Sequence, residues 1–446
     1  MAKLFGTDGV RGVANTELTC DIAFKLGQAA VEFLGKTIVV GKDTRLSGDM
    51  LGNALSAGIM SMGGNVLDAG IIPTPGVAYL VRELHAEGGI VISASHNPPE
   101  YNGIKFFDRQ GFKLTEEAEA EIESFVLAGG ADPESLPSGD AVGVVLPVED
   151  ACELYIQHAI SSLQDKTLDF SKLTIALDTG HGASSLTTAA ALEQLGATVH
   201  VINDSFNGVD INVECGSTHL EPVKELLAET GAQIGIAHDG DADRVMFVDE
   251  LGNEIDGDVI ETVCALDLQK RGLLRDDTVV STVMCNLGFT KAMDAAGISV
   301  VQTQVGDKYV LNEMRKLNAV IGGEQSGHMI FLDHNSTGDG LITALQFLAA
   351  CLRNNQPVSK TAALMQRFPQ ELINVRVADK HAVSENAVVA NAIAEAEAKL
   401  DGSGRILVRP SGTEPLVRVM VEAATHEEAL GYAQEIASII ERELGQ

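Results

Sequence analysis

One order of predicted strands and helices recurs three times along the chain. Each repeat reads strand, helix, strand, helix, strand, and closes with a further strand, an acidic turn and a long helix. Short strands rich in Val and Ile that alternate with helices are typical of α/β domains. The recurrence therefore predicts three related α/β domains with mixed sheets. The first strands are predicted at 37–40, 173–177 and 278–281, and the closing strands at 104–108, 245–249 and 329–333. In the third repeat a helix is predicted at 290–296.

The segment 368–446 follows a different pattern, which predicts a smaller C-terminal α+β domain. A stretch rich in Gly, Pro, Ser and Asp at 128–147 indicates one boundary, and an interruption of the pattern at 367–370 indicates another. We therefore expect domains at 1–150, 151–255, 256–367 and 368–446. The elements predicted in the last domain are a strand at 373–377, a helix at 384–400, strands near 405–408 and 417–422, and a final helix opened by a capping box at Thr425–Glu428.

Acidic residues dominate the charge of this 446-residue chain. Asp and Glu number 63 against 31 Lys and Arg, which gives a formal charge of −32. Such a field repels phosphate backbones, so we expect no nucleic-acid partner, and a small anionic substrate would need its own local cations. The six cysteines stand singly, which predicts reduced core residues of a cytoplasmic protein. No apolar run reaches the roughly 18 residues that span a bilayer, so no membrane partner is expected.

Polar residues gather where the third strand of each repeat is predicted to end. An apolar run at Gly89–Ile92 delivers Ser95 into a turn closed by Asn97–Pro99. The equivalent loops are Asp239–Arg244 in the second repeat and Gly322–His328 in the third. Open α/β sheets bind ligands at the carboxyl ends of their strands. These loops are therefore candidate functional sites, although Ser and Asn are also ordinary turn residues.

The loop of the second repeat carries three carboxylates, Asp239, Asp241 and Asp243, separated by Gly240 and Ala242. On an extended backbone the three side chains would point the same way, and like charges so close together are unfavourable unless a cation joins them. Clustered carboxylate oxygens suit Mg²⁺ or Ca²⁺ rather than zinc. The sequence therefore favours Mg²⁺ at this loop.

Two other interpretations of this acidic loop stay open. Glu250 stands at the twelfth position of an EF-hand-like spacing, but the sixth position is Arg244 instead of Gly, and 244–248 is predicted as a strand. The second alternative is a solvated acidic turn that binds no metal.

Ser95 is a candidate carrier of a phosphoryl group. Mg²⁺ keeps coordination positions for water or phosphate, and a phosphoserine beside it, with cations over its other oxygens, is a phosphoryl donor. Arg11, Lys105 and Arg244 are the candidate cations. His96 raises a serine hydrolase as an alternative, but adjacent side chains on an extended backbone point apart, and no Gly-x-Ser-x-Gly pattern surrounds this serine.

Two further loops carry candidate ligand-binding residues. Glu324 and Ser326, two positions apart, could hold vicinal hydroxyls of a sugar, and His328 adds an imidazole; a polar Gly-rich turn is the alternative. In the last domain a donor-rich loop between two strands predicts a nest for phosphate, with a simple Ser-Gly turn as the alternative. Its candidate ligands are Arg409, Ser411, the Gly412 amide, Thr413 and Arg418.

Five segments together resemble a known family. Phe5–Gly12, Ser93–Lys105, Asp239–Arg244, Gly322–His328 and Arg409–Pro415 are similar, in order and spacing, to the signatures of the α-D-phosphohexomutases. The resemblance covers the whole chain. Its first motif and the Gly322–His328 loop look most like the bacterial amino-sugar enzymes of that family.

The resemblance implies four domains around one central cleft and a phosphorylated Ser95. One Mg²⁺ per chain would be held by that phosphate and the three aspartates of the second repeat. By the same resemblance Lys105 and His328 would transfer or orient protons, and Arg11 and Arg244 would steady the phosphoryl group. The loop of the third repeat would hold sugar hydroxyls, and the C-terminal loop would clamp the other phosphate of the substrate.

An activity is implied as well. The reaction would interconvert glucosamine 6-phosphate and glucosamine 1-phosphate through a 1,6-bisphosphate, with a hexose 1,6-bisphosphate as primer, and would feed UDP-N-acetylglucosamine and cell-wall precursors. The alternatives are a phosphomannomutase or phosphoglucomutase of the same family, a phosphosugar-binding protein without catalysis, and a metal-dependent phosphatase. The expected partner is a phosphosugar, and a homodimer stays open.

Overall fold

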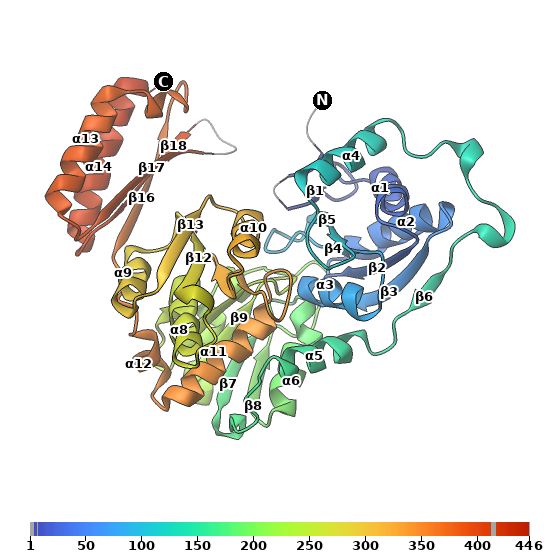
Figure 1. The fold of residues 1–446 in the computed structure, drawn as a ribbon, viewed down its shortest axis with the longest axis horizontal. Coiled ribbons are helices and arrows are strands. Elements are labelled where there is room, and N and C mark those ends of the chain that lie inside the picture. Colours follow the sequence, from blue (N-terminus) through green and yellow to red (C-terminus); the bar gives the residue numbers. More distant parts are fainter. Residues whose placement is uncertain (1–3, 7, 412–415, 446) are drawn as a thin grey trace. The chain divides into compact units, whose positions relative to one another are not determined.

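The computed structural model describes residues 4–6, 8–411 and 416–445 (Figure 1). Contacts divide the chain into two compact units, which are described separately below. The first unit is Met1–Met284 with Ile298–Leu364, and the second is Cys285–Gly297 with Met365–Gln446. Within the described residues, no helix combines the length and the apolar character that a membrane crossing requires.

The first repeat forms a six-stranded sheet with the order β1-β5-β4-β2-β3-β6. Strand β4 is buried along its whole length, as its run of Ile and Val predicts, and helices α2 and α3 pack against it. The elements are β1 (Val10–Val13), α1 (Cys20–Phe33), β2 (Thr37–Lys42), α2 (Ser47–Ser61), β3 (Asn65–Ile71), α3 (Thr74–Glu83), β4 (Gly88–Ile92), β5 (Tyr101–Asp108), α4 (Glu116–Leu127) and β6 (Val145–Pro147).

The second repeat forms a five-stranded sheet with the order β11-β10-β9-β7-β8. Strand β9, which leads into the acidic loop, is buried throughout, like β4. The elements are α5 (Ala151–Ser161), β7 (Thr174–Asp178), α6 (Thr188–Gln194), β8 (Thr198–Ile202), α7 (Glu221–Thr230), β9 (Ile234–His238), β10 (Val245–Asp249) and β11 (Glu254–Ile255).

The third repeat forms a four-stranded sheet with the order β13-β12-β14-β15. Its closing strand ends at Phe331 instead of the predicted Asp333, because the Phe331 carbonyl accepts from the amides of His334 and Asn335 and so begins a turn. The elements are α8 (Gly257–Lys270), β12 (Thr278–Thr282), α9 (Leu287–Ala296), β13 (Ser299–Thr303), α10 (Asp307–Leu317), β14 (Ile321–Gly323), β15 (Met329–Phe331), α11 (Gly340–Asn354) and α12 (Val358–Ala362).

The three sheets share one arrangement of four strands, ordered β5-β4-β2-β3, β10-β9-β7-β8 and β15-β14-β12-β13. In each sheet the first strand of the repeat is parallel to the second and the third, and the fourth strand is antiparallel to the third. The predicted repetition and the mixed sheets are therefore confirmed. The loops that follow β4, β9 and β14 occupy equivalent places in the three sheets.

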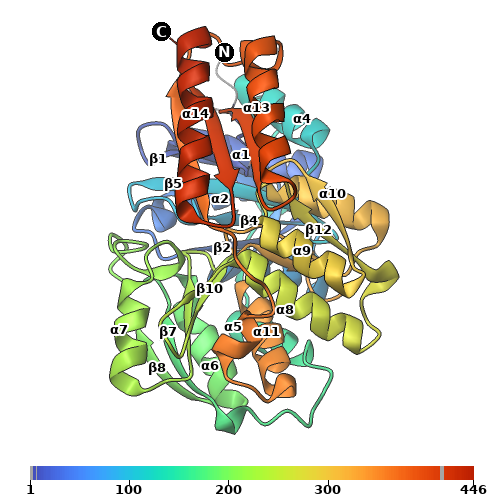
Figure 2. The same cartoon turned by 90° about the vertical axis from the view of Figure 1, so that its left-hand side faces the viewer.

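The second unit contains a three-stranded antiparallel sheet, β16-β18-β17, with α13 and α14 packed side by side on it (Figure 2). Thr425 caps α14 by accepting from the Glu428 amide, as the capping box predicts. The predicted helix at 384–400 begins later, at Ala387, because the Asn386 side chain caps it. The elements are β16 (Gln370–Arg376), α13 (Ala387–Leu400), β17 (Arg405–Pro410), β18 (Leu416–Glu422) and α14 (His426–Leu444).

Helix α9 groups with the second unit, although the sequence places it in the third repeat. The buried Glu422 carboxylate accepts from Asn286 Nδ2 at 3.1 Å and from the Leu287 amide at 3.0 Å. Arg405, which also binds Glu422 at 3.1 Å, donates to the Cys285 carbonyl at 2.7 Å. The helix begins at Leu287 rather than at the predicted residue 290, because the Asn286 side chain caps it.

The six cysteines are all free, as their spacing predicts. Four of them are buried, whereas Cys20 and Cys152 are partly exposed, so the prediction of core positions is wrong for these two. Both lie at the beginning of helices that reach the surface of the first unit.

Short 3-10 helices complete the described chain at Pro133–Ser135, Gly139–Ala141, Phe170–Lys172, Ala183–Leu186, Gly216–Thr218, Arg275–Asp277 and Ala382–Ser384.

Candidate active site

The three strand-end loops of the first unit contact one another. Ser95, after β4, donates a hydrogen bond from Oγ to Asp239 Oδ2, after β9, at 2.6 Å. His328, after β14, lies with Nδ1 3.6 Å from Asp243 Oδ2. Residues 144 positions apart are thus brought within bonding distance by equivalent ends of two sheets. The structure joins the three loops that the sequence singled out.

Ser95 has a left-handed backbone, with φ of +51°. The predicted extended backbone is therefore wrong, and so is the inference that Ser95 and His96 point apart, because Ser95 Oγ lies 3.2 Å from His96 Nδ1. The Ser95 amide donates to Ser93 Oγ at 2.9 Å, which tightens the turn. A left-handed serine is costly unless its surroundings hold it, so this conformation indicates a loop fixed from outside.

Arg45 supplies that fixation. Its buried guanidinium donates to four carbonyl oxygens of the serine loop. The bonds reach Ser95 and Asn97 at 2.9 and 2.8 Å, and Pro98 and Tyr101 at 2.6 and 3.0 Å. The planar fork of an arginine suits such multiple donation, which a lysine could not reproduce.

The charge of Arg45 is balanced by Asp43, two residues before it. Arg45 Nε binds Asp43 Oδ2 at 2.9 Å, and Ser93 Oγ donates to the same oxygen at 2.6 Å. Burial raises the pKa of Asp43, while the Arg45 guanidinium opposes that rise. From the second repeat, Asn212 Nδ2 donates to the Ser95 carbonyl at 2.9 Å. Asp43, Arg45, Ser93 and Asn212 therefore form a scaffold around the serine.

His96 is a poor general base for Ser95. Burial, and then the nearby Arg244, lower the pKa of His96 to about 4. Burial and Arg244 lower the pKa of His96 more than Asp243 and Asp241 raise it, so His96 lacks the closely paired carboxylate of a hydrolase triad. The Ser95 hydroxyl instead donates to Asp239. The hydrolase alternative is disfavoured because His96 is a poor base, and not for the predicted reason that the side chains of Ser95 and His96 point apart.

The carboxylates of Asp239, Asp241 and Asp243 are buried and offer one oxygen each, all within 4.8 Å of one another. They converge on a tight turn and not on the predicted extended backbone. The Ala242 amide donates to the Asp239 carbonyl at 3.0 Å, and Ala242 has φ of +53°. The turn folds the chain back so that the side chains of Asp239, Asp241 and Asp243 meet. The prediction that the three carboxylates converge is confirmed, but they converge because of a turn and not because of an extended backbone.

This triad has the chemistry of a divalent-cation site. Burial, followed by the charges of Asp243 and Asp241, raises the pKa of Asp239 well above its ordinary value. Asp241 Oδ1 and Asp243 Oδ1 are buried and, within the described residues, accept no hydrogen bond. Hard oxygen atoms left in this state fit Mg²⁺. The three residues present are therefore able to hold that ion.

The EF-hand alternative for the acidic loop fails on Glu250. Both oxygens of this carboxylate are engaged by Ser359, whose amide donates to Oε2 at 3.0 Å and whose hydroxyl donates to Oε1. Residues Val245–Asp249 form β10, as predicted, instead of leading into a helix. Glu250 is thus turned toward α12 and is not a ligand of the Asp239 loop.

The three predicted cations lie around the triad. Lys105 Nζ binds Asp241 Oδ2 at 2.8 Å and Asp8 Oδ2 at 3.0 Å. Burial alone would lower the pKa of Lys105, but Asp241 and Asp8 raise it. Arg11 pairs with Asp8, and Arg244 Nε lies 3.9 Å from Asp243 Oδ1.

The third loop surrounds a buried imidazole. His328 lies between Asp243, at 3.6 Å, and Asp307, at 3.8 Å. Burial alone would lower the pKa of His328, but Asp243 raises it. Glu324 Oε1 accepts from the Gly306 amide at 3.0 Å, and Ser326 is exposed. Glu324 and Ser326 lie in a turn, in which the Gly327 amide donates to the Glu324 carbonyl at 3.0 Å.

The predicted phosphate nest lies in the second unit. Arg409 and Arg418 are cross-strand partners of β17 and β18. Burial, and then the charge of Arg418, lower the pKa of Arg409. Ser411 is buried, and Lys380 Nζ donates to its carbonyl at 2.6 Å, so a third cation lies beside the loop. The predicted residues Gly412 and Thr413 lie outside the described part of the chain.

Family models match nearly the whole chain. The matches are to phosphoglucomutase/phosphomannomutase alpha/beta/alpha domain I at residues 2–131, domain II at 153–252, domain III at 256–368 and the C-terminal domain at 372–439. The chain belongs to the phosphoglucomutase/phosphomannomutase family. The predicted family resemblance and fold class are thereby confirmed.

Individual proteins of the family are similar to this chain over its full length. The chain is 52% identical over 447 residues to a phosphoglucosamine mutase of Carboxydothermus hydrogenoformans, covering 99% of this chain and 100% of the relative. It is 49% identical over 450 residues to a phosphoglucosamine mutase of Geobacillus kaustophilus, with 100% of both chains covered. A solved structure of a putative phosphomannomutase from Thermus thermophilus matches with a TM-score of 0.80 and 26% identity, covering 99% of each chain.

Several residues of the site were missed by the sequence predictions. Asp8 lies within the Phe5–Gly12 motif, which could have identified it. Arg45 acts on main-chain carbonyls, which carry no signal in a sequence. Lys113 and Asp307, which form an ion pair near His328, come from different repeats and belong to no motif.

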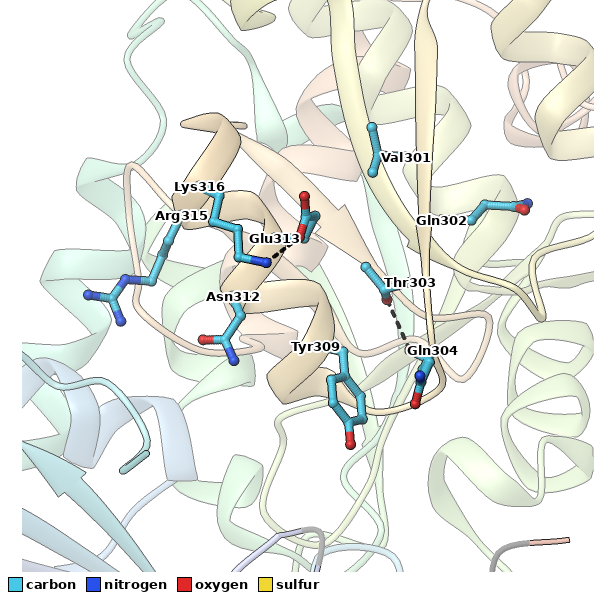
Figure 3. Close-up of a pocket in the computed structure, with 9 residues that line it drawn as sticks. All are labelled: Val301, Gln302, Thr303, Gln304, Tyr309, Asn312, Glu313, Arg315 and Lys316. Atoms are coloured by element: carbon cyan, nitrogen blue, oxygen red, sulfur yellow. Dashed lines mark hydrogen bonds and ion pairs between the residues drawn. The ribbon is translucent and has the colours of Figure 1, made fainter. Parts of the chain in front are cut away.

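A cavity of about 800 Å³ is present in the third repeat (Figure 3). It is an open groove between β13 and α10, and no predicted site residue lines it. Lys316 Nζ lies 2.8 Å from Glu313 Oε2. Figure 3 shows this pair on α10. The lining residues are Val301, Gln302, Thr303, Gln304, Tyr309, Asn312, Glu313, Arg315 and Lys316.

Proposed function

We propose that this member of the family is a phosphoglucosamine mutase, which interconverts glucosamine 6-phosphate and α-D-glucosamine 1-phosphate. The observation that carries the proposal is the hydrogen bond from the buried Ser95 hydroxyl to Asp239, inside a buried carboxylate triad flanked by Lys105. Relatives of that name at 52% and 49% identity over the full chain support the choice of an amino sugar.

Ser95 is the residue that carries the phosphoryl group. In the first transfer a free sugar hydroxyl attacks the phosphorus, the bond from phosphorus to Ser95 Oγ breaks, and a 1,6-bisphosphate forms. In the second transfer Ser95 Oγ attacks the other phosphate, whose bond to the sugar oxygen breaks. The serine regains its phosphate, and no phosphate is released. A hexose 1,6-bisphosphate supplies the first phosphate to an unphosphorylated enzyme.

Asp239, Asp241 and Asp243, together with the serine phosphate, would hold Mg²⁺ at this site. When bound, it neutralises charge on the transferring phosphoryl group. The protein supplies the remaining positive charge, from Arg11 and Arg244. Charge neutralisation and alignment are what this reaction mainly requires.

Two groups handle the proton that each transfer moves. Lys105 binds Asp241, and both Lys105 and His328 lie within 4 Å of Asp243 Oδ2, at 3.8 and 3.6 Å. We assign to them the transfer or orientation of the proton that leaves the attacking hydroxyl and returns to the leaving oxygen. A symmetric reaction suits two such groups, because the sugar reacts at both of its ends.

The rest of the sugar is bound by the other loops. Glu324 and Ser326 hold hydroxyl groups, and the C-terminal loop binds the phosphate that is not reacting. That loop offers Arg409, Ser411, Gly412, Thr413 and Arg418. A domain that opens and closes at residues 367–372 would let the bisphosphate turn over.

The substrate is the only partner that the proposal requires. A cytoplasmic location and a role in cell-wall precursor synthesis belong to the proposal as well.

A phosphomannomutase or phosphoglucomutase is the second candidate, since the Thermus thermophilus structure carries the former name. The same residues would perform the same transfers. The two candidates differ in the group at carbon 2 of the sugar, so the choice depends on substrate preference.

The deciding experiment compares kcat/KM for glucosamine, glucose and mannose phosphates, with Mg²⁺ and a bisphosphate primer. We expect the amino sugar to be preferred, and Ser95→Ala to lose turnover by roughly 10⁴-fold or more while it keeps the wild-type melting temperature. Ser161→Ala, which removes a hydroxyl from the exposed face of α5, is the control. Intact-mass measurement should find the phosphate in wild type and not in Ser95→Ala. Wild-type turnover in Ser95→Ala would overturn the phosphoserine mechanism.

A further inference from the structure

Six side chains form a closed ring of alternating charge beside the Asp triad. Lys105 binds Asp8 at 3.0 Å, Asp8 binds Lys113 at 2.5 Å, and Lys113 binds Asp307. Asp307 lies 3.8 Å from His328, which lies 3.6 Å from Asp243, and Asp243 lies 3.8 Å from Lys105. Basic and acidic side chains alternate all the way round.

The ring joins the two groups assigned to proton handling by two routes. One route is short and passes through Asp243 alone. The other passes through Asp8, Lys113 and Asp307, none of which belongs to the mechanism described above. These three are mostly buried, with 17%, 12% and 16% of their side chains exposed. Charges so shielded interact more strongly than surface pairs.

Lys113 occupies the central place on the longer route. It follows β5 in the first repeat, whereas Asp307 begins α10 in the third. Its ammonium group contacts both Asp8 and Asp307, and their charges raise its pKa although burial alone would lower it. A single ammonium group thus connects the domain of the phosphoserine to the helix beside the sugar loop.

Neighbouring contacts hold the same two segments together. Lys308 pairs with Glu116, and the Arg315 guanidinium lies 4.2 Å from the centre of the Phe112 ring. These contacts secure the interface without touching the ring. The interface alone therefore does not explain why a buried ammonium group is placed between two carboxylates, which is costly to desolvate.

We propose that Lys113, together with Asp8 and Asp307, is a positioning residue of the phosphotransfer site that fixes Lys105 and His328 relative to each other. Asp8 orients Lys105 and Arg11, Asp307 orients His328, and Lys113 links the two carboxylates. The proton-handling groups of the two sugar ends are thereby held at a constant separation. The inference rests on the proposed mutase function.

The test compares two lysine variants of one interface. Lys113→Met breaks the ring, whereas Lys308→Met removes an equal charge from the same pair of segments and leaves the ring intact. We expect kcat of Lys113→Met to fall roughly 10- to 100-fold, because small displacements of catalytic groups have effects of that size. KM should change by less than about threefold, because the sugar and phosphate loops are untouched. Lys308→Met should match the wild type in both parameters.

A second variant separates positioning from stability. Asp307→Asn in the Lys113→Met background removes the carboxylate that has lost its partner, so the double variant should regain melting temperature. Its kcat should equal that of Lys113→Met and stay below the wild-type value. Because Asp307→Asn alone should also lower kcat, this non-additive result would identify one coupled unit. All rates are measured well below the melting temperature of each variant.

Two results would overturn the inference. One is a wild-type kcat in Lys113→Met; the other is a fall in kcat that returns to the wild-type value in the double variant together with its melting temperature. The proposed function fails separately, if the wild-type protein does not turn over any hexose phosphate. If the wild type turns over hexose phosphates but Lys113→Met has the same kinetics as Lys308→Met, the positioning role of the ring is contradicted and the mutase function still stands.

Discussion

The loop after β4 and the loop after β14 hold the same place in their sheets and are built differently. Around Ser95 an arginine donates to four carbonyls, and the serine is 1% exposed. Around Glu324 the bonds are mainly those of the main chain, from the Glu324 amide to the His328 carbonyl and from the Gly327 amide to the Glu324 carbonyl, each 3.0 Å. Ser326 in that loop is exposed.

The difference matches the two tasks in the proposed reaction. The serine makes and breaks a covalent bond, so its position must be held closely against the Asp triad. The third loop has to accept the sugar in both of its orientations, and an exposed side chain can contact either one. Rigidity is therefore concentrated on the reacting group, and the sugar-binding loop is left accessible.

Metal removal should lower turnover more than any other change considered below. In the proposed mechanism only the loop of Ser95, and not the loop of Glu324, supplies a ligand to the metal. A chelator should reduce turnover by roughly 10³-fold or more, since the buried carboxylates would then repel each other and the phosphate. Added Mg²⁺ should stabilise the protein by about 2.7 kcal/mol at one hundred times its Kd. Scanning fluorimetry measures this as a higher melting temperature. A melting temperature of Asp241→Asn that still rose with Mg²⁺ as in the wild type would place the ion elsewhere.

Breaking the Arg45 scaffold should come next in size. Arg45→Met leaves Asp43 buried without its partner, which costs about 3 to 5 kcal/mol of stability. It should also lower kcat roughly 100-fold, because the left-handed Ser95 turn loses four hydrogen bonds. Arg45→Lys keeps the charge and should recover stability more than kcat. Arg353→Met, which breaks an ion pair with Asp267 elsewhere, is the control for losing a mostly buried arginine. Equal losses of kcat in the two Met variants would contradict a special role for Arg45.

The sugar loop should respond least. Glu324→Gln should lower kcat/KM roughly 10- to 100-fold and Ser326→Ala less than about tenfold, chiefly through KM, because an exposed hydroxyl contributes mainly binding. Steady-state kinetics with glucosamine 1-phosphate separates the two parameters. Phosphorylation of Ser95 by a bisphosphate should proceed in both variants. A larger loss in Ser326→Ala than in Arg45→Met would reverse the comparison between the loops.

The sequence predicted the repeats and the functional loops because both depend on local patterns. Alternating Val- and Ile-rich strands with helices identified three sheets of one order, and the loops carrying Ser95, Asp239 and His328 stood at equivalent strand ends. The boundaries of α9 and α13 were missed by three residues each, because Asn286 and Asn386 cap these helices and neither was considered.

The geometry inside the loops could not be predicted in the same way. Ser95 and Ala242 adopt left-handed backbones that depend on bonds from distant residues, such as Arg45 and Asn212 for the serine loop. The bond from Arg45 spans 50 positions and ends on a carbonyl, a group that every residue has. Tertiary contacts of this kind leave no pattern in the chain, and the assumption of an extended backbone failed for that reason.

The shared strand order also bears on how such a chain can acquire new chemistry. Each repeat contributes buried hydrophobic residues to a cluster of its own. A segment exchanged at the end of β4, β9 or β14 would meet a parallel strand on one side and an antiparallel strand on the other in every case. After duplication of an ancestral domain, each copy could therefore change its loop independently, and one inherited framework could come to carry a nucleophile, a metal site and a sugar-binding site.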